Sequence, residues 1–208
     1  MNPSMKTTEY VRKLVTCILV VAVAVFAACY PSPDLAIEDY DTVVTVVTEG
    51  ADFSGYSTYF MPDSVFQRGD EGNVSRDFDD LILDGIQRNM EKLGYVYQAD
   101  TAGTDLLVVA SAITQEQWGA YLGWPFFGGG LGGGFQYPSG SMRYLYTSGT
   151  VAIDMAEIAK LDPEENVYPV EWTASISGPL QSTKENTPDR ITNGIDQAFA
   201  QSPYLKPD

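Results

Sequence analysis

Apolar and polar side chains alternate with a period of two over residues 167–177, which predicts a β-strand. The side chains expected on its inward face are Tyr168, Val170, Trp172, Ala174 and Ile176, and those expected on the other face are Glu171, Thr173 and Ser175. Runs of β-branched and aliphatic residues predict further strands at 41–48, 56–61, 105–114 and 144–155. Residues 94–97 fit a short strand or a turn. We expect 41–48 to be buried on one face and partly on the other, and 105–114 to be a central strand.

Residues 77–93 have the spacing of an amphipathic helix. Its apolar stripe consists of Phe78, Leu81, Ile82, Ile86, Met90 and Leu93. Gly94 follows and is expected to end the helix in the left-handed region. A last helix is predicted to start with Thr187 as N-cap and Pro188 at the first helical position. Its stripe consists of Ile191, Ile195, Ala198 and Phe199, and Ser202-Pro203 is expected to stop it.

The order of these elements predicts the fold class. The late strands follow one another without crossover helices, so we expect them to pair in antiparallel fashion. We therefore predict an α+β fold, in which a largely antiparallel sheet carries two amphipathic helices packed on one face. No linker or change of composition divides residues 41–208, which are predicted to form a single domain.

The N-terminal residues carry the pattern of an export signal. Lys6, Arg12 and Lys13 precede an apolar run from Leu14 to Ala28. A helix over that run would be roughly 22 Å long, short of the ~30 Å hydrocarbon core of a bilayer. A basic start, a short apolar run and small residues before a cleavage point are typical of a signal peptide, here 1–28.

Phe26-Ala27-Ala28-Cys29 resembles the lipobox of bacterial lipoproteins. The resemblance implies cleavage before Cys29 and acylation of that residue, so that two or three acyl chains attach the protein to a membrane. Residues 29–40 contain two prolines and several acids, and we expect them to form a short tether. The expected location is the outer membrane with the domain facing the periplasm, and display on the cell surface is the alternative.

Composition excludes several classes of function. The chain has no histidine, which rules out Ser/His/Asp and Cys/His catalytic groups. A net charge of −16 argues against nucleic-acid binding, which needs clustered Lys and Arg. Two cysteines cannot build a disulfide framework or a four-thiolate zinc site. We predict neither a metal site nor a cofactor. The formal G-x-G-x-x-G match at 128–133 lacks the flanking strand and helix of a dinucleotide site.

A series of short motifs in a fixed order resembles a known family. They are Asp52-Phe-Ser-Gly-Tyr-Ser-Thr-Tyr59, Leu93-Gly-Tyr95, Thr104-Asp-Leu-Leu-Val-Val109, Gly149-Thr-Val-Ala-Ile-Asp-Met155 and Glu171-Trp-Thr-Ala174, followed by a terminal helix. This series resembles the bacterial envelope lipoproteins that contain domain of unknown function 4136. Thr104 departs from the family, which usually has proline there. The resemblance implies a secreted, usually lipidated α+β domain and supplies no catalytic residues.

Residues 118–143 are predicted to form a long hairpin loop between two strong strands. They hold nine of the 19 glycines and seven aromatic residues. Long loops of this kind are often functional. One hypothesis is an aromatic contact surface for a membrane, a glycan or an envelope protein. The candidate contact residues are Trp118, Tyr121, Trp124, Phe126 and Phe127. The alternative is a disordered glycine loop whose aromatic residues partly fold back onto the sheet.

Carboxylates are the remaining candidates for chemistry. Glu157, Glu165 and Glu171 could serve a hydrolase, but nothing in their spacing brings any two of them together. The sequence therefore predicts a lipid-anchored envelope protein with a non-enzymatic binding or structural role. The alternative is a carboxylate-dependent hydrolase of envelope polymers, which would need two close carboxylates with perturbed pKa values in a pocket.

Overall fold

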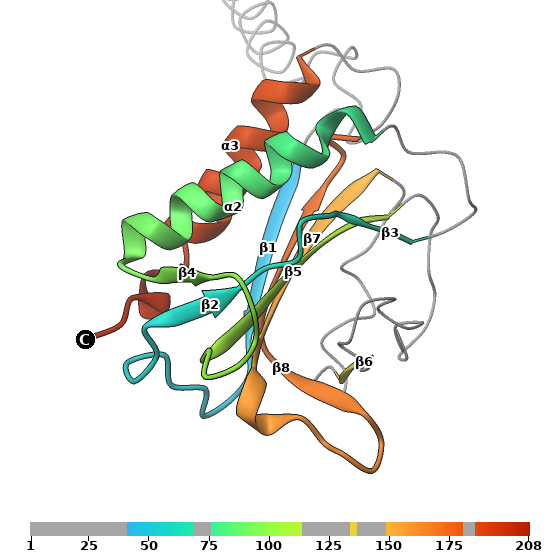
Figure 1. The fold of residues 1–208 in the computed structure, drawn as a ribbon. Helices are drawn as coiled ribbons and strands as arrows, with labels where there is room; N and C mark the ends of the chain where they lie inside the picture. The colour runs from blue at the N-terminus through green and yellow to red at the C-terminus, as the bar shows by residue number, and fades with distance from the viewer. Residues whose placement is uncertain (1–40, 69–75, 114–133, 137–148, 181–185) are drawn as a thin grey trace, which may run out of the picture. The chain divides into compact units, whose positions relative to one another are not determined.

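The computed structural model describes residues 41–68, 76–113, 134–136, 149–180 and 186–208 (Figure 1). The strands are β1 (Thr42–Val47), β2 (Thr58–Phe60), β3 (Phe66–Arg68), β4 (Val96–Gln98), β5 (Leu106–Ile113), β6 (Gly134–Gln136), β7 (Thr150–Glu157) and β8 (Val167–Ser177). The helices are α2 (Asp79–Leu93) and α3 (Thr187–Ala200), with 3-10 turns η2 (Arg76–Phe78), η3 (Ile158–Lys160) and η4 (Pro203–Leu205). Within those ranges, no helix has the length and apolar character needed to cross a bilayer.

The strands form a mixed sheet in the order β1-β8-β7-β5-β2-β4. The long strands pair with one another in antiparallel fashion, as predicted: β1 with β8, β8 with β7, and β7 with β5. β2 runs parallel to both β5 and β4, and β3 runs parallel to β5. The sequence prediction missed these parallel pairs. They arise because the chain passes through α2 between β2 and β4, and such a crossover returns the chain in the same direction.

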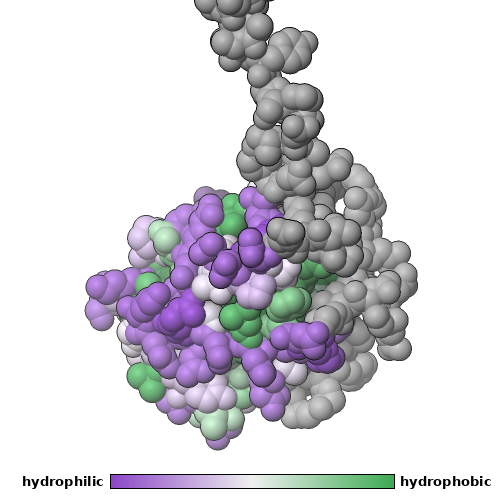
Figure 2. Space-filling model, turned by 90° about the horizontal axis from the view of Figure 1, so that it is seen from above, coloured by the Kyte–Doolittle hydropathy of each residue, from purple (hydrophilic) through white to green (hydrophobic). Residues whose placement is uncertain are grey.

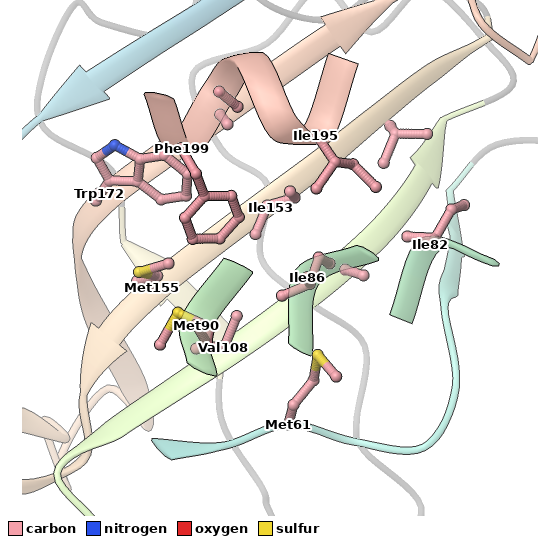
Figure 3. Packing of buried hydrophobic residues seen from close by; sticks show 14 of the residues in the cluster. Met61, Ile82, Ile86, Met90, Val108, Ile153, Met155, Trp172, Ile195 and Phe199 are labelled. Carbon is pink, nitrogen blue, oxygen red and sulfur yellow. The ribbon is translucent and has the colours of Figure 1, made fainter. Parts of the chain in front are cut away.

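Both helices cover the same face of the sheet, which confirms the α+β prediction (Figure 1). The predicted stripes of both helices point into one cluster with the inward side chains of β5, β7 and β8 (Figure 3). Ile86 and Ile195 are fully buried there. Gly194 lets α3 approach the sheet, since a Cβ at this position would lie 2.4 Å from Cγ2 of Ile176. The main core is therefore a helix layer packed closely on a sheet.

A bulge in β8 reverses which side chains point to each face of the sheet. Trp172 pairs with Met155 and Val170 pairs with Ala156, which leaves Glu171 as an extra residue between them. An extra residue exchanges the two faces of a strand. Tyr168 and Val170 therefore belong to a second cluster, on the other face from Trp172, and the prediction of one inward face for all five side chains was wrong. The other members of the second cluster are Leu107, Val109, Phe135 and Ala156.

Two smaller predictions also need correction. No residue of β1 is fully buried, because β1 is an edge strand, although Val43 packs against the core. Thr187 is the first residue of α3, and the N-cap is Asn186, whose φ of 60° lies in the left-handed region that asparagine tolerates. Gly94 ends α2 with a φ of 106°, as predicted.

Candidate functional site

A cluster of polar side chains joins four segments at one end of the sheet, where β7 ends and the bulge of β8 lies. Lys160 Nζ lies 2.7 Å from Glu171 Oε1 and 3.0 Å from Glu157 Oε2. The hydroxyl of Tyr56 donates to Glu157 Oε2 at 2.7 Å. Glu157 and Glu171 thus share one ammonium group, which corrects the prediction that no two of the candidate carboxylates come together. We call these four residues the corner cluster.

The local fold explains why the corner cluster forms. Glu157 is the last residue of β7, and η3 places Lys160 three residues later on the same side. Glu171 is the extra residue of the bulge in the neighbouring strand. Its side chain is only 7% exposed, whereas that of Lys160 is 47% exposed. The bulge therefore turns a carboxylate inward, and a lysine covers it from the solvent side.

Asp105 lies beside the corner cluster and fixes the start of β2. Its Oδ2 accepts hydrogen bonds from the backbone N–H groups of Ser57 and Thr58, at 2.8 and 2.9 Å. The Thr58 hydroxyl donates to the same oxygen at 2.8 Å. Burial raises the pKa of Asp105, but the hydrogen bonds from Ser57 and Thr58 outweigh it and leave the pKa below its ordinary value. This carboxylate is a charged anchor for the backbone.

The electrostatics of the corner cluster favour the usual charge states of Glu157, Lys160 and Tyr56. Burial raises the pKa of Glu157, but hydrogen bonds from Tyr56 and Lys160 outweigh it, so the net shift is downward. Hydrogen bonds to Glu171 and Glu157 raise the pKa of Lys160. Burial, and then the hydrogen bond to Glu157, raise the pKa of Tyr56. A general acid in a hydrolase needs a carboxyl whose pKa is raised. The shift at Glu157 has the opposite sign.

A second carboxylate that the sequence analysis missed lies in the middle of the sheet. Asp154 of β7 is fully buried and accepts a hydrogen bond from the Thr173 hydroxyl at 2.7 Å. The signal in the sequence was an acid inside an otherwise apolar strand, Val151-Ala-Ile-Asp-Met155. For Lys160, the signal was a cation three residues after the acid that ends a strand. Within the described ranges, no three acidic or thiol side chains are grouped so that they could hold a metal ion.

The predicted lipidation site, Cys29, and the predicted contact residues lie outside the described residues. The contact residues are Trp118, Tyr121, Trp124, Phe126 and Phe127. Of the segment 118–143, the structure describes β6, in which Phe135 packs against Tyr168 with ring centroids 6.2 Å apart. Trp172 is a core residue, as its place on an alternating strand predicts. Its indole N–H donates to the buried hydroxyl of Ser202 at 3.1 Å.

Comparison with known proteins identifies a family and a fold. Residues 43–204 match the family model described as Domain of unknown function (DUF4136). A DUF4136 family protein from Bacteroides thetaiotaomicron is 25% identical, with a TM-score of 0.64, over 81% of this chain and 98% of that one. The PelC dodecamer from Paraburkholderia phytofirmans is 11% identical with a TM-score of 0.38, over 81% of this chain and 99% of that one. A comparison with the curated proteins finds no match.

Proposed function

We propose that this chain, which belongs to the DUF4136 family of unknown function, is a lipid-anchored protein of the cell envelope with a non-enzymatic binding or structural role. The observation that carries the proposal is Cys29, which follows two small residues at the end of an apolar run of signal-peptide length. Acylation of this residue would attach the domain to a membrane, since each buried CH₂ of an acyl chain contributes ~0.8 kcal/mol.

The distance between the anchor and the domain supports a location close to the bilayer. β1 begins at Thr42, so residues 30–41 separate it from Cys29. A fully extended chain of that length spans at most about 40 Å. The net charge of −16 opposes adhesion to anionic headgroups, so attachment would depend on the acyl chains. We propose the outer membrane with the domain in the periplasm, and the cell surface is the alternative.

The corner cluster supports the non-enzymatic part of the proposal. Its two carboxylates are bound to one lysine, and the pKa of Glu157 is lowered instead of raised. An acid and base pair needs pKa values that are pushed apart, with one carboxyl kept protonated near neutral pH. The cluster is therefore better suited to joining β7, β8 and the chain before β2 than to cleaving a glycosidic bond.

Membrane partition of cysteine variants tests the anchor. In Cys29→Ser we expect the protein to leave the membrane fraction, because no sulfur is left to carry the acyl chains. Cys17→Ser is the matched control, since Cys17 lies within the predicted signal peptide. It should leave partition unchanged. Full membrane recovery of Cys29→Ser, equal to that of Cys17→Ser, would refute the anchor.

A further inference from the structure

The strands at the two ends of the main strand order, β1 and β4, differ in a way that points to a partner. β4, at one end, has three residues, whereas β1, at the other end, has six. Natural edge strands are usually protected by shortness, by charged residues, by proline or by a bulge. β1 has none of these protections. Residues 42–47 read Thr-Val-Val-Thr-Val-Val, and their register with β8 has no shift.

Hydrogen bonding identifies the backbone groups of β1 that face outward. The N–H of Thr48 donates to the carbonyl of Glu171 on β8 at 2.8 Å. In an antiparallel pair, residues alternate between those that bond to the partner strand and those that point away from it. Even-numbered residues of β1 therefore bond to β8. The N–H and C=O groups of Val43, Thr45 and Val47 point to the open edge.

The sequence around β1 is a palindrome centred on one of those outward residues. Residues 41–49 read Asp-Thr-Val-Val-Thr-Val-Val-Thr-Glu, which is the same in both directions except that Asp and Glu exchange at the ends. A two-fold axis through Thr45 would pair Thr45 with itself and Val43 with Val47. These are the residues whose backbone groups point away from β8, and among the described residues no strand other than β8 pairs with β1. The palindrome and the outward direction of the odd-numbered backbone groups thus specify the same antiparallel register.

The side chains of β1 suit that register as well. Val44 is 37% exposed and Val47 is 40% exposed. The two-fold axis would set Val44 opposite Val46 and Val47 opposite Val43, so that valine meets valine across the new pair. Cross-strand pairs of β-branched residues stabilise a sheet. No charged residue lies between Thr42 and Thr48.

Charged residues at the ends of β1 affect the pairing of two copies. The two-fold register brings Asp41 close to Glu49 of the second copy, which is a contact between like charges. Asp41 already binds a cation, because Arg190 Nε donates to its Oδ2 at 2.6 Å and Arg190 Nη2 also donates to it. Arg190 offsets part of the repulsion, and the net charge of −16 opposes association as a whole.

We propose that β1 pairs edge to edge with β1 of a second copy of this chain, in the antiparallel register centred on Thr45. The result is an isologous dimer in which one sheet continues across the two-fold axis. A single strand pair buries little area, so the dimer is weak and depends on concentration. The proposal rests on residues 41–49 and Arg190 and does not depend on the lipid anchor.

Sedimentation of the full chain in detergent tests the dimer. We expect the sedimenting mass of the protein to double as its concentration rises. Val44→Lys places two lysines in the strand pair and should weaken association about tenfold or more. Thr45→Pro removes the central outward N–H and should act in the same direction. Val96→Lys, on the exposed face of the opposite edge strand, is the matched control and should dimerise like the wild type.

A charge reversal tests the register. Glu49→Lys would turn the contact with Asp41 of the second copy into an ion pair at both ends of the strand pair. We expect tighter association, by a few-fold at low salt. Glu165→Lys makes the same change of charge in the exposed turn before β8 and is the control. The proposal is overturned if the wild type stays monomeric at high concentration, or if Val44→Lys and Thr45→Pro dimerise as well as Val96→Lys. It is also overturned if Glu49→Lys raises the affinity of the dimer no more than Glu165→Lys does.

Discussion

The helix-covered core and the corner cluster hold the same sheet together by different physics. In the core, α2 and α3 place aliphatic side chains on β5, β7 and β8, and most of the residues there are fully buried (Figure 3). In the corner cluster, three charged groups and a phenol join Tyr56, the end of β7 and the bulge of β8. The free energy gained in the core grows with the apolar area that is removed from water. Exposed ion pairs contribute less, because water screens the attraction between their charges.

Stability and specificity have different sources in this domain. The core supplies most of the favourable free energy, because its residues lose nearly all their contact with water. The corner cluster supplies alignment, because its bonds fix Glu157 and Glu171 to one lysine in the place where β8 changes face. On the face seen from above in Figure 2, the described surface is largely hydrophilic, with hydrophobic side chains in small groups. Three substitutions separate these contributions, starting with the largest expected effect.

Ile86→Ala should weaken the core most. The side chain of Ile86 is fully buried among other apolar side chains, so truncating it to alanine leaves a cavity beneath α2. We expect a loss of about 2–5 kcal/mol in the free energy of unfolding, measured by urea denaturation. Val96→Ala, at a position that is 57% exposed, is the control and should change stability by less than about 0.5 kcal/mol. Equal effects of the two substitutions would contradict this assignment of the core.

Gly194→Ala tests the close approach of α3 to the sheet. The added methyl group would overlap Ile176, which is part of β8 and cannot move freely. Overpacking of this kind costs about 1–3 kcal/mol, although alanine is the better helix former. Gly85→Ala is a milder comparison, since its Cβ would meet the flexible end of Ile195 at 3.1 Å. The unfolding temperature of Gly194→Ala should be lower than that of Gly85→Ala. The reverse order would show that α3 does not approach the sheet most closely at Gly194.

The sequence analysis predicted the core better than the corner, and the reasons are physical. The strand at 167–177 has the predicted bounds because alternation is a local signal. The helix over 77–93 follows from its own spacing and from Gly94 in the same way. The parallel pairs of β2 are contacts between distant segments, and no local pattern specifies them.

The corner cluster could not be predicted from the sequence pattern, because it too depends on contacts between distant segments. A bulge depends on how two strands pair, so the alternation of β8 gave no sign that Glu171 is an extra residue and that Tyr168 faces the other way. Lys160 lies only three residues after Glu157 in sequence, but its second partner, Glu171, lies on another strand. Spacing alone could therefore predict at most half of the cluster.

Lys160→Met should have the smallest effect of the three, and that effect should depend on pH. It removes the cation that two carboxylates share, and we expect a loss of about 1 kcal/mol at neutral pH, since Lys160 is 47% exposed and screened by water. Lys206→Met, at an exposed position in the C-terminal residues, is the control and should be neutral.

The sign of the pH dependence follows from Glu157. Its folded pKa lies below the ordinary value of 4.5, so its contribution to stability is present above 4.5 and is lost as pH falls through the folded pKa. The difference between wild type and Lys160→Met should therefore be largest at neutral pH and shrink in acid. A difference that grows as pH falls would mean that Lys160 does not stabilise the charged form of Glu157.

The proposed function depends on an acyl anchor at Cys29, which intact-mass spectrometry of the native protein can detect. We predict that the first residue of the mature chain is Cys29 and that its mass includes acyl chains. A native protein that still contains Met1, or an unmodified cysteine at position 29, would contradict the proposed anchor and the envelope location that depends on it.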